Sequence, residues 1–316
     1  MKLKKVMALT MAGAMAATTL TACGSSSSTT ETTKAAETTA AAAADTTAAA
    51  ADNGSSDAET VLQVAFENSI SEPVGQGWEK AQEIIKEKSG GKMAIEIYPD
   101  SQLGDKSSLI DSMLLGENVC TLADGAFYVD YGVPDFGIVF GPFLFDSWDQ
   151  VWKLVDSDWY KEQCDKLEEK GLKIIASNWI YGERHTLTNV PVNTVDDLKG
   201  LKIRVPSNEI QSKGFDVLGA TSTGMALGDV YQALQTKTID GAENPLATLY
   251  GRKLHEVAKY LILDGHVRTS QHGLYPLTGS TAFRKSSRHG YLRQQKKLVS
   301  TTTKYSRLLT LSTFRR

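Results

Sequence analysis

The chain has 316 residues and a formal net charge of −3, with 34 Lys and Arg against 37 Asp and Glu, and three Cys. Residues 284–316 hold ten Lys and Arg and no acidic residue, so residues 1–283 carry 24 cations and 37 anions, a net charge of −13. An acidic body argues against binding of a nucleic-acid backbone as the main function, and three Cys exclude a small disulfide-framework protein.

The N-terminus has the pattern of an export signal. Three lysines among the first five residues precede residues 6–20, a run of 15 apolar and small residues that is shorter than the about 20 a membrane-spanning helix needs. The run closes on Leu20-Thr21-Ala22-Cys23, which resembles a bacterial lipoprotein cleavage box; the alternative is an ordinary signal peptide with an incidental cysteine. We expect residues 1–22 to be a signal peptide, and Cys23 to carry a lipid that anchors the protein at the extracytoplasmic face of the cell membrane.

Residues 23–60 have the composition of a disordered tether. Between residues 24 and 59 there are 12 Ala, 8 Thr and 6 Ser, and there is no large apolar side chain to bury. Such a segment cannot offset the entropy lost on ordering. We expect it to hold a folded body away from the membrane, at a reach of roughly 30–35 Å.

Short strand patterns and amphipathic helix patterns alternate from Val61 onward. Strands are predicted at 61–66, 93–98, 119–123, 172–177, 201–205, 237–242 and 263–273, and helices from Pro73 to before Gly90, at 106–115, after Ser147, and at 159–170, 196–200, 209–218 and 229–235. This alternation predicts an α/β fold with a largely parallel sheet, built as two doubly wound lobes with a ligand cleft between them. We expect lobe I at 61–181, lobe II at 182–269, and a return to lobe I at about 270–283.

Catalytic and metal-binding motifs are missing from the sequence. There is no Walker loop, GxSxG, HExxH or CxxC, and the five His lack metal-ligand spacing. Cys120 and Cys164 form a disulfide or remain small buried side chains; the sequence leaves both open. Two roles are open for Trp148 and Trp152. They could stack on a sugar ligand, but their helical spacing favours the alternative, in which they pack a helix against a hydrophobic core. The pattern predicts neither an enzyme nor a metal or cofactor.

Arg204 is the most informative charged residue, because it lies in a strand pattern that is otherwise hydrophobic and ends at Pro206. A buried guanidinium is costly unless it meets an anion, and its planar fork matches a carboxylate with two parallel hydrogen bonds. The alternative is an Arg at the surface of an edge strand, alternating with Lys202.

Several motifs, in order along residues 61–283, resemble one family. They are Tyr98-Pro99-Asp100-Ser101-Gln102-Leu103-Gly104, Leu167-Glu168-Glu169-Lys170-Gly171-Leu172, Asp197-Leu198-Lys199-Gly200-Leu201-Lys202-Ile203-Arg204, Asp229-Val230-Tyr231-Gln232-Ala233-Leu234-Gln235 and Asp240-Gly241-Ala242-Glu243-Asn244-Pro245. Together they are similar to the solute-binding proteins of TRAP (tripartite ATP-independent periplasmic) transporters, of the dicarboxylate-binding type.

The resemblance implies a receptor that has a periplasmic-binding-protein-like (class II) fold, binds an organic acid and delivers it to a membrane permease. By this resemblance, the family's carboxylate-binding residues correspond to Arg204, Arg184 and Asn244. Glu67 and Asp124 correspond to positions at which the family contacts the part of the ligand that lies away from the carboxylate. We expect a monomer without metal, cofactor or nucleic-acid partner. The alternatives are an exported α/β enzyme acting on an acidic substrate and a structural envelope lipoprotein.

The resemblance stops at about Phe283. Residues 284–316 lack acidic residues and a sustained apolar period, as expected of a shifted reading frame; the alternative is a genuine basic tail that binds anionic lipid or wall polymers. If the frame is shifted, the second lobe is truncated, and we expect weak or absent ligand binding by the chain as it stands.

Overall fold

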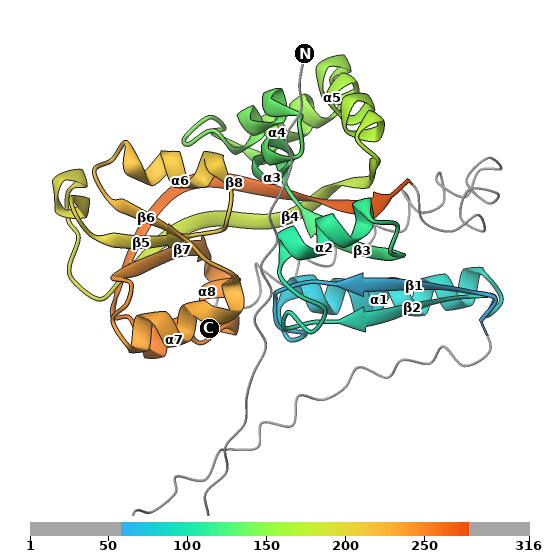
Figure 1. Ribbon diagram of the computed structural model, residues 1–316, viewed down its shortest axis with the longest axis horizontal. Coiled ribbons are helices and arrows are strands. Elements are labelled where there is room, and N and C mark those ends of the chain that lie inside the picture. The colour runs from blue at the N-terminus through green and yellow to red at the C-terminus, as the bar shows by residue number, and fades with distance from the viewer. Residues whose placement is uncertain (1–57, 278–316) are drawn as a thin grey trace, which may run out of the picture. The chain divides into compact units, whose positions relative to one another are not determined.

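The computed structural model describes residues 58–277, in which one mixed sheet has the strand order β2-β1-β3-β8-β4-β7-β5-β6 (Figure 1). We call β1–β3 with α1 and α2 the first lobe, and β5–β7 with α6–α8 the second lobe; β4 and β8 lie between them. The predictions for residues 1–57 and 278–316 lie outside the described residues.

The first lobe begins with two parallel strand–helix units. Its elements are β1 (Thr60–Ala65), α1 (Pro73–Lys88), β2 (Met93–Tyr98), α2 (Lys106–Leu114) and β3 (Val119–Ala123). Pro73 occupies the first turn of α1, where its missing N–H costs nothing. Trp78 of α1 packs against Trp179, with ring centroids 5.2 Å apart, and so fixes the helix on the sheet.

Four helices follow β3 before the chain returns to the sheet. They are α3 (Gly125–Asp130), the 3₁₀ helix η1 (Pro134–Phe140), α4 (Trp148–Val155) and α5 (Asp158–Glu169). The hydroxyls of Ser147 and Ser157 cap α4 and α5 by accepting backbone N–H groups, as the sequence predicts for Ser147. Trp148 and Trp152 stack on each other along α4, with centroids 5.8 Å apart.

Two long strands, β4 (Leu172–Thr188) and β8 (Tyr260–Pro276), connect the lobes (Figure 1). They run antiparallel to each other, and β8 is also antiparallel to β3, as β4 is to β7. The prediction of a largely parallel sheet is therefore wrong at its centre, because one strand carries the chain to the second lobe and the other carries it back. Register shifts interrupt this pair, one of them between Ile180 and Gly182. The expected lobe boundaries at Gly182 and at about 270 fall within these strands and stay predictions.

The second lobe repeats the strand–helix alternation on a smaller scale. Its elements are η2 (Val195–Leu198), β5 (Lys202–Val205), α6 (Glu209–Asp216), β6 (Thr221–Gly224), η3 (Leu227–Asp229), α7 (Val230–Gln235), β7 (Gly241–Pro245), α8 (Leu246–Gly251) and η4 (Leu254–Glu256). β5 pairs in parallel with β6 and β7. Buried side chains of α7, β7 and α8 form the core beneath this sheet, with Val230, Leu234 and Leu249 among them.

The α/β class and most element positions follow the sequence prediction, with several differences. The strand expected at 237–242 lies at β7, four residues later, because Lys237 adopts a left-handed turn conformation (φ 59°). The sequence patterns did not predict α3, η1, β6 or α8, and they predicted β4 only to residue 177. Cys120 and Cys164 are not joined by a disulfide. Among the residues described, no helix combines the length and apolarity that crossing a bilayer requires.

Candidate functional site

All five binding residues predicted from the sequence line one small polar cavity. Glu67 follows β1, Asp124 follows β3, Arg184 lies on β4, Arg204 on β5 and Asn244 on β7. The cavity measures about 20 Å³, which is space for about one water molecule. Groups that lie 177 residues apart in the chain meet here because strands of both lobes end at this cavity, β1 and β3 from the first lobe and β5 and β7 from the second.

Arg204 is 1% exposed, yet none of the described residues gives it a carboxylate at hydrogen-bonding distance. Its Nε and Nη2 both donate to the carbonyl oxygen of Met225, at 2.8 and 2.5 Å. Burial lowers the pKa of Arg204, and the nearby Glu67 acts in the opposite direction. A buried cation whose hydrogen-bond acceptor is a neutral carbonyl remains short of compensating charge, so it favours an anion in the cavity.

Arg184 is also buried, but it has a carboxylate partner. Its Nε donates to Glu243 Oε2 at 2.5 Å and its Nη2 to Glu243 Oε1 at 2.6 Å, a two-bond arrangement that fixes the guanidinium plane. Burial alone would lower the pKa of Arg184, but Glu243 raises it above its ordinary value. Glu243 therefore holds Arg184 in position, while the ion pair reduces the charge that Arg184 presents to a ligand.

A chain of ionisable groups continues from Glu243 through His266 to Asp264. His266 Nε2 lies 3.2 Å from Glu243 Oε2, and its Nδ1 lies 3.1 Å from Asp264 Oδ2. Burial would lower the pKa of His266, but the hydrogen bonds and charges of Asp264 and Glu243 raise it to about 9. Burial would likewise raise the pKa of Asp264, but His185, His266 and Thr186 hold it below its ordinary value. His266 is thus a cation at neutral pH.

We expect the His266 cation to make the folding free energy depend on pH in the alkaline range. The pKa of His266 is raised from 6.5 to about 9 in the fold, so its contribution is complete below pH 6.5 and is lost as the pH rises to about 9. Urea unfolding at pH 6.5, 8 and 9.5 should show falling stability in the wild type and a flatter profile in His266→Gln. An equally steep profile in His266→Gln would contradict this assignment.

Asn244 completes the donor side of the cavity. Its Oδ1 accepts hydrogen bonds from Arg184 Nη2 at 3.2 Å and from the Tyr181 hydroxyl at 3.3 Å. Its Nδ2 is buried and has no partner among the described residues. Because an unsatisfied buried donor costs free energy, Asn244 Nδ2 would gain from donating a hydrogen bond to an acceptor that enters the cavity.

The cavity wall opposite Arg204 and Asn244 carries two acidic side chains, Asp124 and Glu67. Asp124 caps α3, its Oδ1 accepting the N–H of Ala126 at 3.1 Å, and burial raises the pKa of its carboxyl against the opposing charges of Lys106 and Arg184. Glu67 Oε1 accepts the N–H of Leu227 at 3.0 Å and so connects the first lobe to the second.

Lys106 is a cavity residue that the sequence analysis missed. It occupies the first position of α2, and its Nζ lies 4.9 Å from the centroid of the Phe127 ring. Burial lowers the pKa of this ammonium, while Asp124 and Glu67 act to raise it. The sequence offered one indication that Lys106 lies at the cavity, namely its position directly after the Gly104-Asp105 turn that begins α2.

The cavity lining therefore carries three cations, Lys106, Arg184 and Arg204, against the carboxylates of Glu67 and Asp124. With all five ionised the lining has a net charge of +1, and the negative charge of Glu243 already compensates Arg184. The arrangement can bind an anion beside Arg204 and Asn244, and hydroxyl groups beside the two acids.

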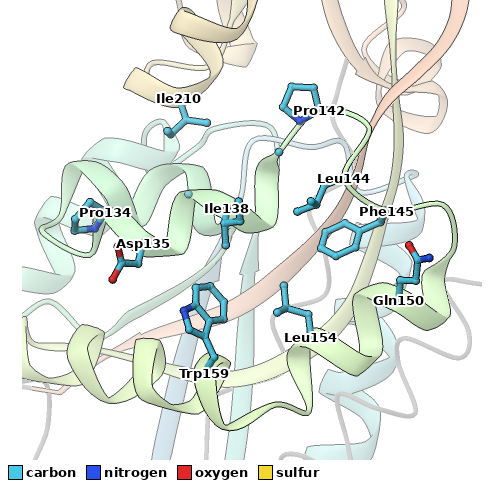
Figure 2. A pocket seen from close by; sticks show the side chains of 12 residues that line it. Pro134, Asp135, Ile138, Pro142, Leu144, Phe145, Gln150, Leu154, Trp159 and Ile210 are labelled. Carbon is cyan, nitrogen blue, oxygen red and sulfur yellow. The ribbon is translucent and has the colours of Figure 1, made fainter.

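Two larger cavities have a different character. One, of about 910 Å³, lies between η1, residues 141–145, α4 and α5; Figure 2 shows Ile138, Leu144, Phe145 and Leu154 converging on it. A second, of about 710 Å³, lies beside α6 and includes Phe143 and Phe215. Their linings are mainly apolar, and neither contains any of the five predicted residues. Among the described residues no group of three or more His, Cys, Asp or Glu could hold a metal ion.

Comparison with known proteins gives this geometry a context. Residues 64–275 match the family model "Bacterial extracellular solute-binding protein, family 7". The sialic acid-binding periplasmic protein SiaP of Vibrio cholerae is 30% identical over 69% of this chain and 67% of its own length. The C4-dicarboxylate-binding periplasmic protein DctP of Rhodobacter capsulatus is 32% identical over 61% of this chain and 58% of its own length.

The fold has solved counterparts as well. The crystal structure of a TRAP periplasmic solute-binding protein from Ochrobacterium anthropi, with bound L-fuconate, matches 80% of this chain and 83% of that one, with 35% identity and a TM-score of 0.75. The chain spans about 58–67% of the length of the two curated relatives. Because the family model covers about two thirds of the sequence, the chain belongs to the bacterial extracellular solute-binding proteins of family 7 and has their two-lobed fold.

Proposed function

We propose that the protein is an extracytoplasmic receptor that binds an organic acid and delivers it to the membrane permease of a TRAP transporter. The observation that carries this proposal is the buried Arg204 guanidinium. Among the described residues it has no carboxylate partner, and it lies in one cavity with Arg184 and with Asn244, whose Nδ2 has no acceptor among those residues. A ligand carboxylate would supply both the missing charge and the missing acceptor.

The cavity wall that carries Glu67 and Asp124 favours a hydroxylated monocarboxylic acid over a C4-dicarboxylate. Glu67 and Asp124 are acceptors for hydroxyl groups, and they would repel a second ligand carboxylate. Lys106, which both carboxylates influence electrostatically, would donate to a hydroxyl oxygen. The relative from Ochrobacterium anthropi, described with bound L-fuconate, supports this class, although the curated relatives include a C4-dicarboxylate-binding protein.

Ligand entry requires the lobes to move. A cavity of about 20 Å³ cannot contain a six-carbon acid, so the described conformation is the closed one. Contacts between the lobes, such as that of Glu67 with Leu227, hold it closed. Opening along β4 and β8 would expose the cavity, and the ligand would then stabilise a closed form in which the cavity is enlarged to hold it and its carboxylate neutralises Arg204.

The remaining parts of the proposal concern localisation. A signal peptide at residues 1–22 and a lipid at Cys23 would place the receptor on the outer face of the cell membrane, and the tether at 23–60 would leave it free to meet the permease. The periplasmic location named for its relatives agrees with export. We propose that it acts as a monomer.

Titration calorimetry with L-fuconate, succinate and L-fucose tests this function. We expect L-fuconate to bind, succinate to bind at least tenfold more weakly, and neutral L-fucose, which lacks the carboxylate, not to bind. The measurement should use the chain as it stands and a version with the frame restored after Phe283, because we expect the first to bind more weakly. Product formation would indicate an enzyme instead, and indifference of both versions to every acid would indicate a structural lipoprotein.

A further inference from the structure

Glu72 forms an unusual contact between the lobes. It belongs to the first lobe, directly before α1, yet its carboxylate Oε2 accepts a hydrogen bond from the Thr248 hydroxyl of α8 at 2.9 Å. Asn68 Nδ2 donates to the same oxygen at 2.7 Å, and the N–H of Ser69 donates to Oε1 at 2.9 Å. Glu72 is 2% exposed, so three hydrogen bonds replace the water that a carboxylate ordinarily binds.

The second lobe itself covers this carboxylate. A Cβ added at Gly251 of α8 would lie 2.5 Å from Glu72 Cγ and 2.9 Å from Oε1, so the helix backbone packs directly on the side chain. Moving α8 away with the second lobe would therefore return water to Glu72. The burial of this group is a property of the closed conformation.

The contact is also connected to the ligand cavity. The Thr248 hydroxyl lies 2.9 Å from the hydroxyl of Tyr181, and that hydroxyl donates to Asn244 Oδ1 at 3.3 Å. Asn68, Tyr181 and Asn244 all line the cavity. A series of close polar contacts thus runs from Glu72 to the amide that we propose receives the ligand.

We propose that Glu72 couples closure of the lobes to uptake of one proton, so that the receptor captures its ligand more tightly as the pH falls. The proposal rests on the proposed function only where it concerns ligand affinity; the coupling of closure to the proton is a property of the fold.

The charged and titratable groups around Glu72 support this assignment. Arg252, after α8, lowers the pKa of Glu72, as do the hydrogen bonds from Ser69, Asn68 and Thr248, while burial is the largest effect and raises it from 4.5 to about 7. Arg252 is itself paired with Asp100, its Nη1 lying 2.7 Å from Asp100 Oδ1. On β4, Tyr181 is the titratable neighbour, and its pKa is raised to about 12, chiefly by burial, so it stays neutral.

The direction of the pH effect follows from these values. In the open form, with water at the carboxylate, the pKa approaches its ordinary value, so between about pH 5 and 7 the closed form binds more protons than the open form. Closure is therefore favoured as the pH falls through this range. The ligand affinity should rise by up to about tenfold for each pH unit between 7 and 5.

Calorimetry of L-fuconate binding at pH 6, in buffers of different ionisation enthalpy, measures the proton directly. We expect the wild type to take up close to one proton on binding, and Glu72→Gln to take up none and to lose the pH dependence of its affinity. Glu87→Gln, an exposed carboxylate on α1, is the matched control and should behave as the wild type. Thr248→Val removes a donor to the carboxylate and should move the midpoint of proton uptake to higher pH.

Hydrogen–deuterium exchange of residues 246–251 in the ligand-free chain, corrected for the intrinsic rates, tests the coupling without a ligand. We expect slower exchange at pH 5.5 than at 7.5 in the wild type and no such difference in Glu72→Gln. Ligand binding without proton uptake would overturn the coupling and leave the receptor function intact. If no acid binds, the receptor function fails, and an exchange rate that is the same at both pH values would then overturn the coupling.

Discussion

Replacing Arg204 by Ala should weaken L-fuconate binding by about 3–5 kcal/mol, a factor of roughly 150 to 5,000. The guanidinium is buried and has no carboxylate partner among the described residues, so the ligand carboxylate would be its charge partner. Arg204→Lys keeps the charge but loses the planar fork, and we expect it to recover little of the affinity. The measurement is titration calorimetry in the version of the chain that binds more tightly.

Lys202→Ala provides the matched control for this change. It lies on the same strand, two residues before Arg204, and its side chain is exposed. We expect its affinity to equal that of the wild type. An Arg204→Ala protein that is folded by circular dichroism and binds L-fuconate within threefold of the wild type would remove Arg204 from the site.

Replacing Glu243 by Gln should destabilise the fold by about 3–5 kcal/mol. The substitution preserves the volume but removes the negative charge that lies between Arg184 and the His266 cation, so the buried Arg184 and the partly buried His266 would both face a neutral amide. Because the pKa of Glu243 is held low by Arg184 and His266 in spite of burial, its charge is present throughout the neutral range. Urea unfolding at pH 7 measures the loss.

Glu183→Gln is the control for this second change. Glu183 precedes Arg184 on β4 and pairs with Arg268 of β8 at 2.9 Å, but its side chain is 39% exposed. A surface pair of this kind contributes at most about 1 kcal/mol. Equal effects of the two substitutions would show that Glu243 has no special role in holding Arg184.

The residues that line the cavity could be predicted from the sequence better than the contacts that hold them in place. The family resemblance brings Arg204, Arg184 and Asn244 together, and the position of Arg204 in an otherwise apolar strand pattern singled it out independently. The role of Glu243 could not be predicted, since its partner Arg184 is 59 residues away and the pairing depends on the antiparallel register of β4 and β7. The burial of Glu72 likewise depends on a contact with Thr248, 176 residues away.

The main error in the fold prediction has a similar origin. Residues 172–177 alternate clearly, whereas 178–188 contain Gly182, Glu183 and His185, which look like loop residues. These side chains are accommodated in β4 because it passes between the lobes, where the polar residues Asp264 and Arg268 of β8 pair with them. Tertiary contacts of this kind override local strand propensity.

A crystal structure with L-fuconate, of the version of the chain that binds it more tightly, tests the central claim most directly. We predict that the ligand carboxylate lies at hydrogen-bonding distance, about 2.7–3.1 Å, from the Arg204 guanidinium and from Asn244 Nδ2, with the sugar hydroxyls toward Glu67 and Asp124. A carboxylate bound elsewhere, with Arg204 still donating only to the Met225 carbonyl, would contradict the account.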